Sequence, residues 1–306
     1  MWYRRCSRGY SVIDLSQYPN PLMNKPVKVD TGFKADSYER FMFDNFKIVD
    51  KNQQAVPFQV QPAQHSLNVM MQDYLDVLIL KARKMGFSSD ALGIATTKFL
   101  MGENEKCVSM SFEQGAAEKQ LSRAKYYIKS YEEANQMKVN FKYNSKNTMA
   151  LESKKANDQG GYDYFQNILQ VGTFGNKSFG RGDDISYLHL TEVSLADLDE
   201  LMAGVGEACL PMAHKVLETT ANGFNTYKRT WDSAILNENG YAALFYSPYW
   251  EYTKEYVDKK RNDLGRLGAQ EFPLTAEEAF LTSGETYFDV LAMRWYMENT
   301  REVMAV

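Results

Sequence analysis

The sequence predicts an α/β fold in which a mostly parallel central sheet is flanked by helices. From Asp76 onward, short apolar segments of β character alternate with segments of helical periodicity. Parallel strands need long crossover connections, usually helices, so this alternation favours a parallel sheet. The length of 306 residues, 44% of them hydrophobic, is enough to fill a large core. We expect strands at 76–80, 106–111, 168–173, 185–193, 215–220 and 242–247.

The segments between these strands carry the expected helices. Residues 89–100 have helical character, and residues 113–134 place apolar side chains on one helical face. That face consists of Leu121, Ala124, Ile128 and Tyr131. A further helix is expected to begin with Ser194 as its N-cap and Asp197 three residues later.

Two regions lack this regular alternation. Residues 1–45 are rich in aromatic residues and interrupted by proline, so we expect an extended or loosely packed N-terminal arm. Residues 138–165 are polar and contain glycine, and we expect them to form a hairpin-bearing insertion.

Composition excludes several classes of function. Three cysteines and three histidines are too few and too scattered for a disulfide framework or a histidine-rich metal cluster. No apolar run approaches the roughly 18–20 residues that a membrane span needs, and we expect no signal peptide. The formal charge of −4 does not indicate a particular class of partner. The charges are unevenly distributed, however, because residues 81–155 are basic and residues 182–306 are acidic. Such a skew fits a bound polyanion, and equally a solvated charged surface.

The segment after the first expected strand has the shape of a phosphate-binding loop. In the usual motif, G-x-x-x-x-G-K-[ST], backbone N–H groups cradle the phosphates, the lysine reaches them and the hydroxyl holds Mg²⁺. Here Lys81 replaces the first glycine, Gly86 is kept, Phe87 stands at the lysine position and Ser88 supplies the hydroxyl. An ordinary strand–turn–helix corner would explain the same residues.

A second signal is the strand that ends at Thr191 and Glu192. An apolar strand ending in an acidic residue suits an ATPase, because the carboxylate can polarise the attacking water near Mg²⁺. An aspartate usually precedes that glutamate, but Thr191 occupies the place, so only Glu192 can act as the base. The alternative is a strand followed by a charge at a helix N-terminus.

Three weaker signals lie elsewhere in the chain. Thr219 and Thr220 end a strand before an Asn-Gly turn and could sense a γ-phosphate, or form an ordinary turn. Arg181 lies in a glycine-rich loop and could offer its guanidinium to a phosphoryl group, or simply face solvent. The amide of Gln64 could read an adenine edge, although glutamine alone is uninformative.

The order of these signals is more specific than any one of them, and it is that of an additional-strand P-loop ATPase. From about residue 46 to residue 289 the chain resembles the ATPase domain of the large terminase subunit of tailed bacteriophages. The stretches that carry the resemblance are LKARKMGFSS, VSMSFEQGAAEKQLSRAKYYI, SFGRGDDISYLHLTEVS, LETTANG and QEFPLTAEEAFLTSGETYFD.

The resemblance assigns the phosphate loop, because this family has a deviant loop, often R-Q-x-G-[KF]-[ST]-[ST], in which the lysine can be absent. Phe87 is therefore tolerated, and the positive charge is expected before Gly86. Arg83 matches the family arginine, with Lys81 or Lys84 in support. Of the two hydroxyls that end the motif, Ser88 matches the Mg²⁺ ligand and Ser89 completes the pair.

The other family motifs are assigned in the same way. Glu192 matches the catalytic glutamate, and Thr191 departs from the usual aspartate, so metal contact there is expected through water. Arg181 matches an arginine proposed to act on the nucleotide of a neighbouring subunit. The threonines at 219 and 220 match the coupling motif, and Gln64 matches the adenine-reading glutamine.

The resemblance also implies domains and partners. We expect an N-terminal arm at 1–45, an ATPase domain at 46–280 and a linker or C-terminal helix at 281–306, with the family's nuclease domain absent from this chain. ATP and Mg²⁺ are the implied cofactors, and the implied location is the host cytoplasm. Double-stranded DNA, bound without sequence preference, a portal protein, a small terminase subunit, a procapsid and a homo-oligomeric ring are the implied partners.

Three alternatives stay open. The basic residues of 119–129 could contact DNA or could form a solvated helix face; they are Lys119, Arg123, Lys125 and Lys129. The chain could be another P-loop DNA translocase, although residues 273–280 are typical of terminase linkers. It could also be an inactive prophage remnant, since the loop lysine, the strand-end aspartate and the nuclease are all missing.

Overall fold

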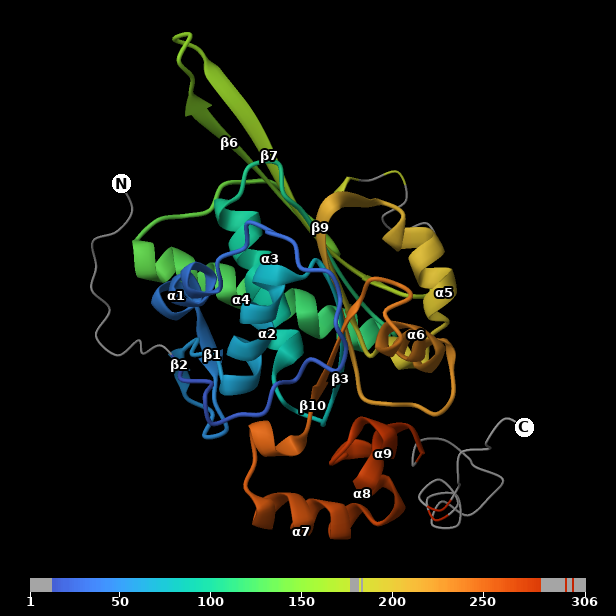
Figure 1. The fold of residues 1–306 in the computed structure, drawn as a ribbon. Coiled ribbons are helices and arrows are strands. Elements are labelled where there is room, and N and C mark those ends of the chain that lie inside the picture. Colours follow the sequence, from blue (N-terminus) through green and yellow to red (C-terminus); the bar gives the residue numbers. More distant parts are fainter. Residues whose placement is uncertain (1–12, 177–181, 183, 282–294, 296–298, 300–306) are drawn as a thin grey trace.

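The computed structural model describes residues 13–176, 182, 184–281, 295 and 299. An eight-stranded sheet with the strand order β10-β3-β9-β8-β4-β7-β6-β5 forms its centre (Figure 1). The strands from β10 to β7 are parallel to one another, whereas β6 pairs antiparallel with β7 and β5 pairs antiparallel with β6. The expected α/β class with a mostly parallel sheet is therefore confirmed. The strands are β3 (Asp76–Lys81), β4 (Lys106–Ser111), β5 (Phe141–Asn144), β6 (Thr148–Ala156), β7 (Tyr162–Thr173), β8 (Ile185–Thr191), β9 (Cys209–Thr219) and β10 (Ala242–Tyr246).

Strand β9 lies between β3 and β8, which is the arrangement of an additional-strand P-loop fold. Leu80 of β3 pairs with Thr219 of β9, and Thr191 of β8 pairs with Glu218. The carboxyl ends of these three strands therefore lie level with one another. Ligands of such sheets bind beyond these ends, so this edge is where a site is expected.

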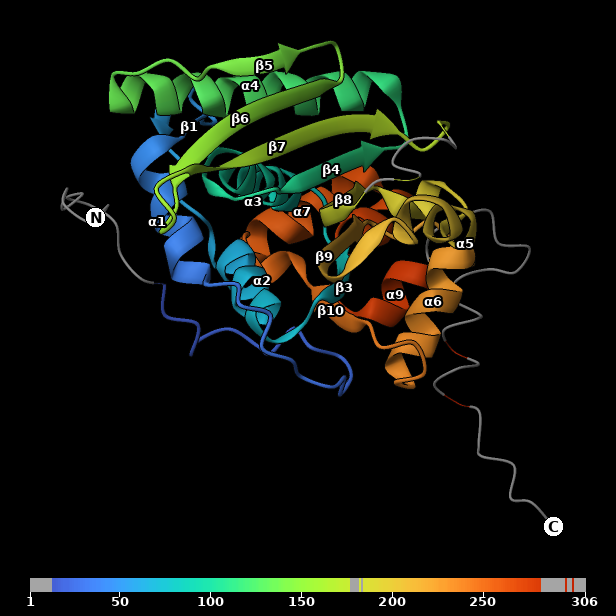
Figure 2. The ribbon, with the colours of Figure 1, turned by 90° about the horizontal axis from the view of Figure 1, so that it is seen from above.

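Strand β3 shows why the sheet is buried on both faces. Val77 and Ile79 pack into the core beneath α2 (Pro62–Asp73) and α3 (Phe87–Met101), whereas Leu78 and Leu80 pack into a second core on the opposite face. Alternate side chains of a strand point to opposite faces, so an unbroken apolar run needs cover on both. Figure 2 shows α2 and α3 on one side of the sheet and α5, α6 and α9 on the other.

The remaining helices connect or cover these layers. Helix α4 buries the apolar face expected from its sequence, and α3 and α4 begin and end within two residues of the expected positions. Among the described residues, no helix is both long and apolar enough to span a membrane. The helices other than α2 and α3 are α1 (Ala35–Asn45), α4 (Gln114–Asn135), α5 (Leu198–Leu201), α6 (Thr226–Ile235), α7 (Lys254–Leu264), α8 (Arg266–Glu271) and α9 (Ala276–Leu281), with short helical turns η1 (Val193–Leu195), η2 (Met202–Gly206) and η3 (Pro248–Trp250).

The N-terminal region differs from the extended arm that the sequence predicts. Residues 13–34 have little regular structure, as expected, but residues 35–45 form α1, whose Ala35 and Met42 are buried in the core. The seven-residue spacing of these two side chains is a helical signal within an otherwise irregular segment. The earlier part of the arm pairs with the sheet edge, where Leu22 forms a β-bridge with Leu244 of β10. That contact covers an otherwise open edge strand.

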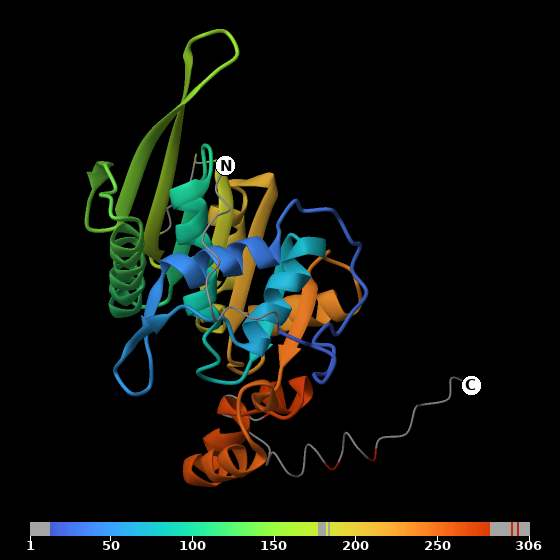
Figure 3. The same ribbon diagram turned by 90° about the vertical axis from the view of Figure 1, so that its left-hand side faces the viewer.

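The expected insertion is a long antiparallel hairpin. Strands β6 and β7 pair from Thr148 with Gln170 to Ala156 with Tyr162, and the expected strand at 168–173 is the C-terminal half of β7. The hairpin projects from one end of the sheet, and α7, α8 and α9 lie at the other end (Figures 1 and 3). A two-stranded sheet, β1 (Lys47–Val49) with β2 (Ala55–Pro57), precedes α2.

The prediction that Ser194 caps a helix is wrong. The cap of α5 is Asp197, whose carboxylate accepts the N–H groups of Asp199 and Glu200. The hydroxyl of Ser194 instead donates to the carbonyl of Thr220 at 2.8 Å. Strand β8 also ends at Thr191 rather than 193, because Glu192 has left-handed backbone angles (φ 59°) that an extended strand does not permit.

Candidate functional site

The segment between β3 and α3 has the backbone of an anion-binding loop. Lys84 (φ 62°) and Gly86 (φ 76°), which are separated by Met85, both have left-handed backbone angles. They lie directly before α3, which begins at Phe87. Alternating backbone angles of this kind form a concave nest of N–H groups, and the adjacent helix N-terminus adds positive potential. The positive φ of Gly86 favours glycine, and a Cβ atom there would also lie 2.3 Å from Nε2 of Gln64, the end of a flexible side chain.

The residue at the usual lysine position takes no part in charge chemistry. Phe87 is almost fully buried, and its ring centroid lies 4.8 Å from that of Tyr246 on β10. Its side chain anchors α3 to the sheet, so a cation for bound phosphate has to come from another residue.

The three cations of the loop differ in their surroundings. The side chain of Lys81 is 11% exposed, and its Nζ lies 3.4 Å from Oε2 of Glu218. The side chain of Arg83 is 59% exposed and is held outward by Glu271 of α8, through an ion pair at 3.0 Å and a backbone hydrogen bond. Lys84 is exposed, and its carbonyl accepts a hydrogen bond from the hydroxyl of Tyr252. Lys81 is therefore the cation held at the carboxyl edge of the sheet.

The two residues predicted for Mg²⁺ meet in the structure. Oγ of Ser88, in the first turn of α3, lies 3.3 Å from Oγ1 of Thr191 at the end of β8. Ser88 is partly buried and Thr191 is buried. Hydroxyl oxygens suit Mg²⁺ directly or through water, but β8 offers no carboxylate at this point. Ser89 lies one residue further into α3, with its N–H bonded to the carbonyl of Gly86.

Glu192 lies at the mouth of this site. Its side chain is exposed, and its backbone N–H donates to the carbonyl of Glu218 at 2.7 Å. The left-handed conformation of a non-glycine residue costs roughly 1–2 kcal/mol and is found disproportionately at functional sites. The exposed side chain of Glu192 thus leaves the chain at a turn that begins where β8 ends.

Glu218 is the site residue that the sequence analysis missed. It is fully buried on β9, and its Oε1 lies 3.1 Å from Nε2 of His189. On the other side of that ring, Nδ1 lies 2.8 Å from Oγ of Ser109, which donates to Gln120. Both ring nitrogens of His189 therefore face oxygen atoms. The available signal was an acidic residue directly after the buried Val216 and Leu217 of β9, since unpaired charges are almost never fully buried.

The charges around Glu218 keep its carboxyl group ionised. Burial alone would raise its pKa, but the Lys81 ammonium and the hydrogen bond with His189 outweigh burial and lower the pKa to about 2. The hydroxyl of Ser88 is close enough to contribute in the same direction. The result is a buried anion at the centre of the strands that carry the loop and Thr191.

The other predicted site residues are placed as follows. Thr219 is buried, and its Oγ1 lies 2.7 Å from Oγ of Ser194, in the turn after Glu192. The carbonyl of Thr220 accepts hydrogen bonds from both hydroxyls. Gln64 accepts the N–H of Gln61 with its Oε1 and directs its amide nitrogen at Gly86. Arg181 lies outside the described residues.

The basic residues considered for DNA contact lie along α4. Lys119, Lys125 and Lys129 are exposed, and Arg123 is partly buried. The opposite face of α4 packs into the core, so these side chains border solvent rather than the loop edge.

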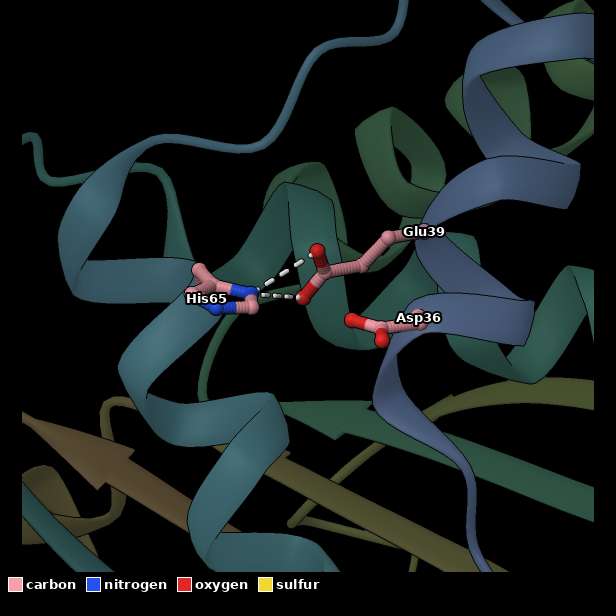
Figure 4. A group of neighbouring side chains, drawn as sticks. All are labelled: Asp36, Glu39 and His65. Atoms are coloured by element: carbon pink, nitrogen blue, oxygen red, sulfur yellow. Dashed lines mark hydrogen bonds and ion pairs between the residues drawn. The ribbon is translucent and has the colours of Figure 1, made fainter. Parts of the chain in front are cut away.

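A second buried polar cluster lies among α1, α2 and α3. Nδ1 of His65 lies 2.9 Å from both carboxylate oxygens of Glu39, with Asp36 alongside (Figure 4). One ligand atom from each of these three residues falls within 4.8 Å of the others, a donor set suitable for a divalent cation. Asn68 extends the cluster, since its amide lies 2.9 Å from Glu39 and 3.5 Å from Asp90 of α3. In this arrangement His65 is engaged by Glu39, so the cluster links α1 and α2 through a buried polar contact.

Comparison with known proteins gives matches only among solved structures. No protein-family model and no curated protein matches the chain. The ATPase domain of the large terminase of Thermus phage P74-26 superimposes with a TM-score of 0.53 at 13% identity, over 71% of this chain and 92% of that one. The large terminase of bacteriophage HK97 gives 0.53 at 14% identity, over 82% of this chain and 51% of that one. The chain thus has the fold of large-terminase ATPase domains, a P-loop fold, and the match spans about half of the HK97 protein.

Proposed function

We propose that this chain is the ATP-hydrolysing motor subunit of a viral DNA-packaging terminase. The observation that carries the proposal is the meeting of three predicted elements at one sheet edge. The left-handed loop at Lys84 and Gly86, the Ser88–Thr191 hydroxyl pair and the exposed Glu192 all lie at the carboxyl ends of β3 and β8. This combination, within a fold shared with terminase ATPase domains, fits binding and hydrolysis of a nucleoside triphosphate.

The loop binds the phosphates of ATP through its backbone N–H groups, with Lys81 as the cation. Lys81 is held at the sheet edge beside Glu218, whereas Arg83 is engaged with Glu271 on the outer side of the loop. Ser88 would hold Mg²⁺, and Thr191, whose hydroxyl lies beside that of Ser88, would contact the metal through water. When bound, the metal neutralises charge on the phosphate oxygens. Gln64, beside Gly86, reads the adenine edge.

Hydrolysis and coupling involve the residues around the η1 turn. Glu192 orients the attacking water, and Arg181 of an adjacent subunit stabilises charge on the transferred group in a ring assembly. The backbone N–H of Ser194 donates to Oγ1 of Thr219 at 3.3 Å, which ties the end of β9 to the turn that carries Glu192. A change at the γ-phosphate can thus reach the 219–220 segment by one short contact.

The exposed basic residues of α4 bind duplex DNA through its phosphates, without sequence preference. Such binding weakens steeply as salt rises, because it releases counterions. A portal protein, a small terminase subunit and a procapsid are the partners of this function, and the host cytoplasm is its location.

The test is ATP hydrolysis by the purified chain, with and without linear duplex DNA, beside Glu192→Ala. We expect turnover that DNA stimulates and that Glu192→Ala lowers by about 10²- to 10⁴-fold, the usual contribution of a general base. Glu238→Ala, which removes an exposed carboxylate after α6, is the matched control and should leave turnover unchanged.

Two other outcomes have distinct meanings. Binding of a fluorescent ATP analogue without turnover would indicate that the arginine of a neighbouring subunit is required, and mixing with portal and procapsid should then restore hydrolysis. Absence of binding at millimolar nucleotide would contradict the motor and favour a remnant that has lost catalysis. Hydrolysis stimulated by DNA but independent of portal would favour another kind of P-loop translocase.

A further inference from the structure

The end of β8 lacks the carboxylate that a Mg²⁺–nucleotide site normally receives from this strand. Thr191 presents a hydroxyl there, 3.3 Å from the hydroxyl of Ser88. Mg²⁺ sites in nucleotide-hydrolysing enzymes usually combine one or two carboxylates with phosphate oxygens and water. Ser88 and Thr191 alone would leave the metal with neutral protein ligands.

The neighbouring strand places a carboxylate at the same level. Glu218 is the registered partner of Thr191 on β9 and of Ile79 on β3. Partners in a parallel ladder project to the same face, and Ile79 packs into the core beneath α3. The side chain of Glu218 therefore lies on the α3 side of the sheet, between the strand of Thr191 and the strand of Lys81.

One oxygen of this carboxylate is held and the other has a weak contact. Oε1 is bonded to Nε2 of His189, and that ring is fixed in turn by Ser109. Among the described residues Oε2 has no hydrogen-bond partner, and its nearest cation is the ammonium of Lys81 at 3.4 Å. A fully buried carboxylate oxygen without a hydrogen bond is costly unless it serves a ligand.

We propose that Glu218 supplies the missing carboxylate to the metal–nucleotide site and that His189 is its positioning residue. The inference rests on the proposed function, because it concerns the same loop. Two departures from the usual motifs then compensate each other: Lys81 replaces the cation absent at Phe87, and Glu218 replaces the anion absent at Thr191. The imidazole that holds Glu218 corresponds to the outer-shell partners that orient metal-ligating carboxylates.

The experiment measures binding of a fluorescent ATP analogue in EDTA and across a Mg²⁺ titration, so it needs no turnover. In the wild-type chain, Mg²⁺ should tighten binding. Glu218→Gln should raise the Mg²⁺ concentration at half-effect by about 10- to 100-fold, while binding in EDTA is equal or tighter, because Lys81 is released toward the phosphates. His189→Gln should shift the Mg²⁺ midpoint in the same direction, by less.

Moving the carboxylate back to β8 is the decisive variant. Glu218→Gln combined with Thr191→Asp should recover the Mg²⁺ response to within a few fold of wild type. Glu278→Gln, which neutralises another buried and ion-paired glutamate far along the chain, is the matched control and should leave the response unchanged. Circular dichroism of each variant shows whether it is folded. If Glu218→Gln does not fold, Glu218→Asp takes its place, with a smaller shift expected.

The outcomes separate the two proposals. Nucleotide binding by Glu218→Gln with an unchanged Mg²⁺ midpoint would overturn the role of Glu218 and leave the ATPase proposal intact. A wild-type chain that binds no nucleotide, with or without Mg²⁺, would overturn the ATPase proposal and the role of Glu218 with it. Recovery in the double variant supports the exchange of carboxylate between β9 and β8.

Discussion

Two buried polar clusters on the α3 side of the sheet differ in the charges that surround their carboxylates. At the strand ends, Glu218 faces two basic groups, Lys81 and His189. Among the helices, His65 is paired with Glu39, and the amide of Asn68 links Glu39 to Asp90. The first cluster is balanced by nearby charge, whereas the second has more acids than bases.

The acid strengths follow from this balance. Two basic neighbours outweigh the burial of Glu218 and hold its pKa at about 2. Asp90 is equally buried, but desolvation and the charge of Glu39 raise its pKa well above the usual value. A carboxyl group whose pKa is lowered in the interior favours its charged form and can serve a cation, whereas one whose pKa is raised favours the protonated form, which donates a hydrogen bond. The two clusters thus differ in the carboxyl group that each buries: the charged form is favoured at Glu218 and disfavoured at Asp90.

The largest expected effect is a difference in the stability that the chain loses when Glu218 or Glu39 is replaced by an apolar residue. Glu218→Leu leaves Lys81 and His189 without their counter-charge, and removing one partner of a buried pair typically costs about 3–5 kcal/mol. Glu39→Leu also frees a base, His65, but it relieves the repulsion on Asp90, so the loss should be smaller. The free energy of unfolding from urea titrations at pH 7 measures both losses. An equal loss in the two variants would contradict the claim that the two clusters differ in charge balance.

The next effect tests the ionised state of Glu218 through pH. Its pKa is lower in the folded chain (about 2) than the ordinary 4.5, so its contribution is complete above pH 4.5 and is lost as pH falls toward 2. The difference corresponds to about 3 kcal/mol of unfolding free energy. Glu218→Gln should flatten the profile between pH 4.5 and 2. A slope unchanged in that variant would mean that other carboxylates cause the acid instability.

The sequence predicted the larger part of the fold because alternation is a local property. The strands at 106–111 and 242–247 and the helices α3 and α4 were found within about two residues, since their apolar runs are long and unmixed. Helix α1 was missed because its few apolar residues follow an irregular proline-containing stretch. The capping role of Ser194 was wrong because the competing partners, Thr219 and Thr220, lie on a strand distant in sequence.

The site was predicted in its motifs but not in its charges. Ser88 and Thr191 were expected near one metal, and the structure brings their hydroxyls together. Which of Lys81 and Arg83 lies at the sheet edge depends on α8, which holds Arg83 outward through Glu271. Glu218 was not recognised, because its partners Lys81 and His189 come from two other strands, β3 and β8, and only the strand order brings them together.

The second cluster offers a stabilising substitution. The raised pKa of Asp90 means that burying its charged form is unfavourable, so its contribution to stability becomes less favourable as pH rises above the ordinary value of 3.8. Asp90→Asn removes that cost, and we expect a gain of about 1–3 kcal/mol at pH 7, the usual range for an unsatisfied buried polar group. Thermal unfolding at pH 5, 7 and 9 should show the gain growing with pH. Asp36→Asn, at the exposed rim, is the control and should change little. A destabilised Asp90→Asn variant would show that the carboxylate is needed in its charged form.

The smallest effect is expected at Arg83, which lies in the same loop as Lys81 but outside the cluster around Glu218. Its ion pair with Glu271 is largely exposed, and such pairs contribute about 0–1 kcal/mol. Arg83→Met should therefore lower the unfolding free energy by at most that amount and change nucleotide affinity by less than about threefold, because 1.4 kcal/mol corresponds to a factor of ten. Lys81→Met should weaken nucleotide binding by at least about tenfold, as expected for a hydrogen bond to a charged group. The opposite result, a large loss of affinity in Arg83→Met and a small one in Lys81→Met, would mean that Arg83 turns inward when nucleotide binds. The cation of the site would then be Arg83, as the family resemblance predicts, and not Lys81.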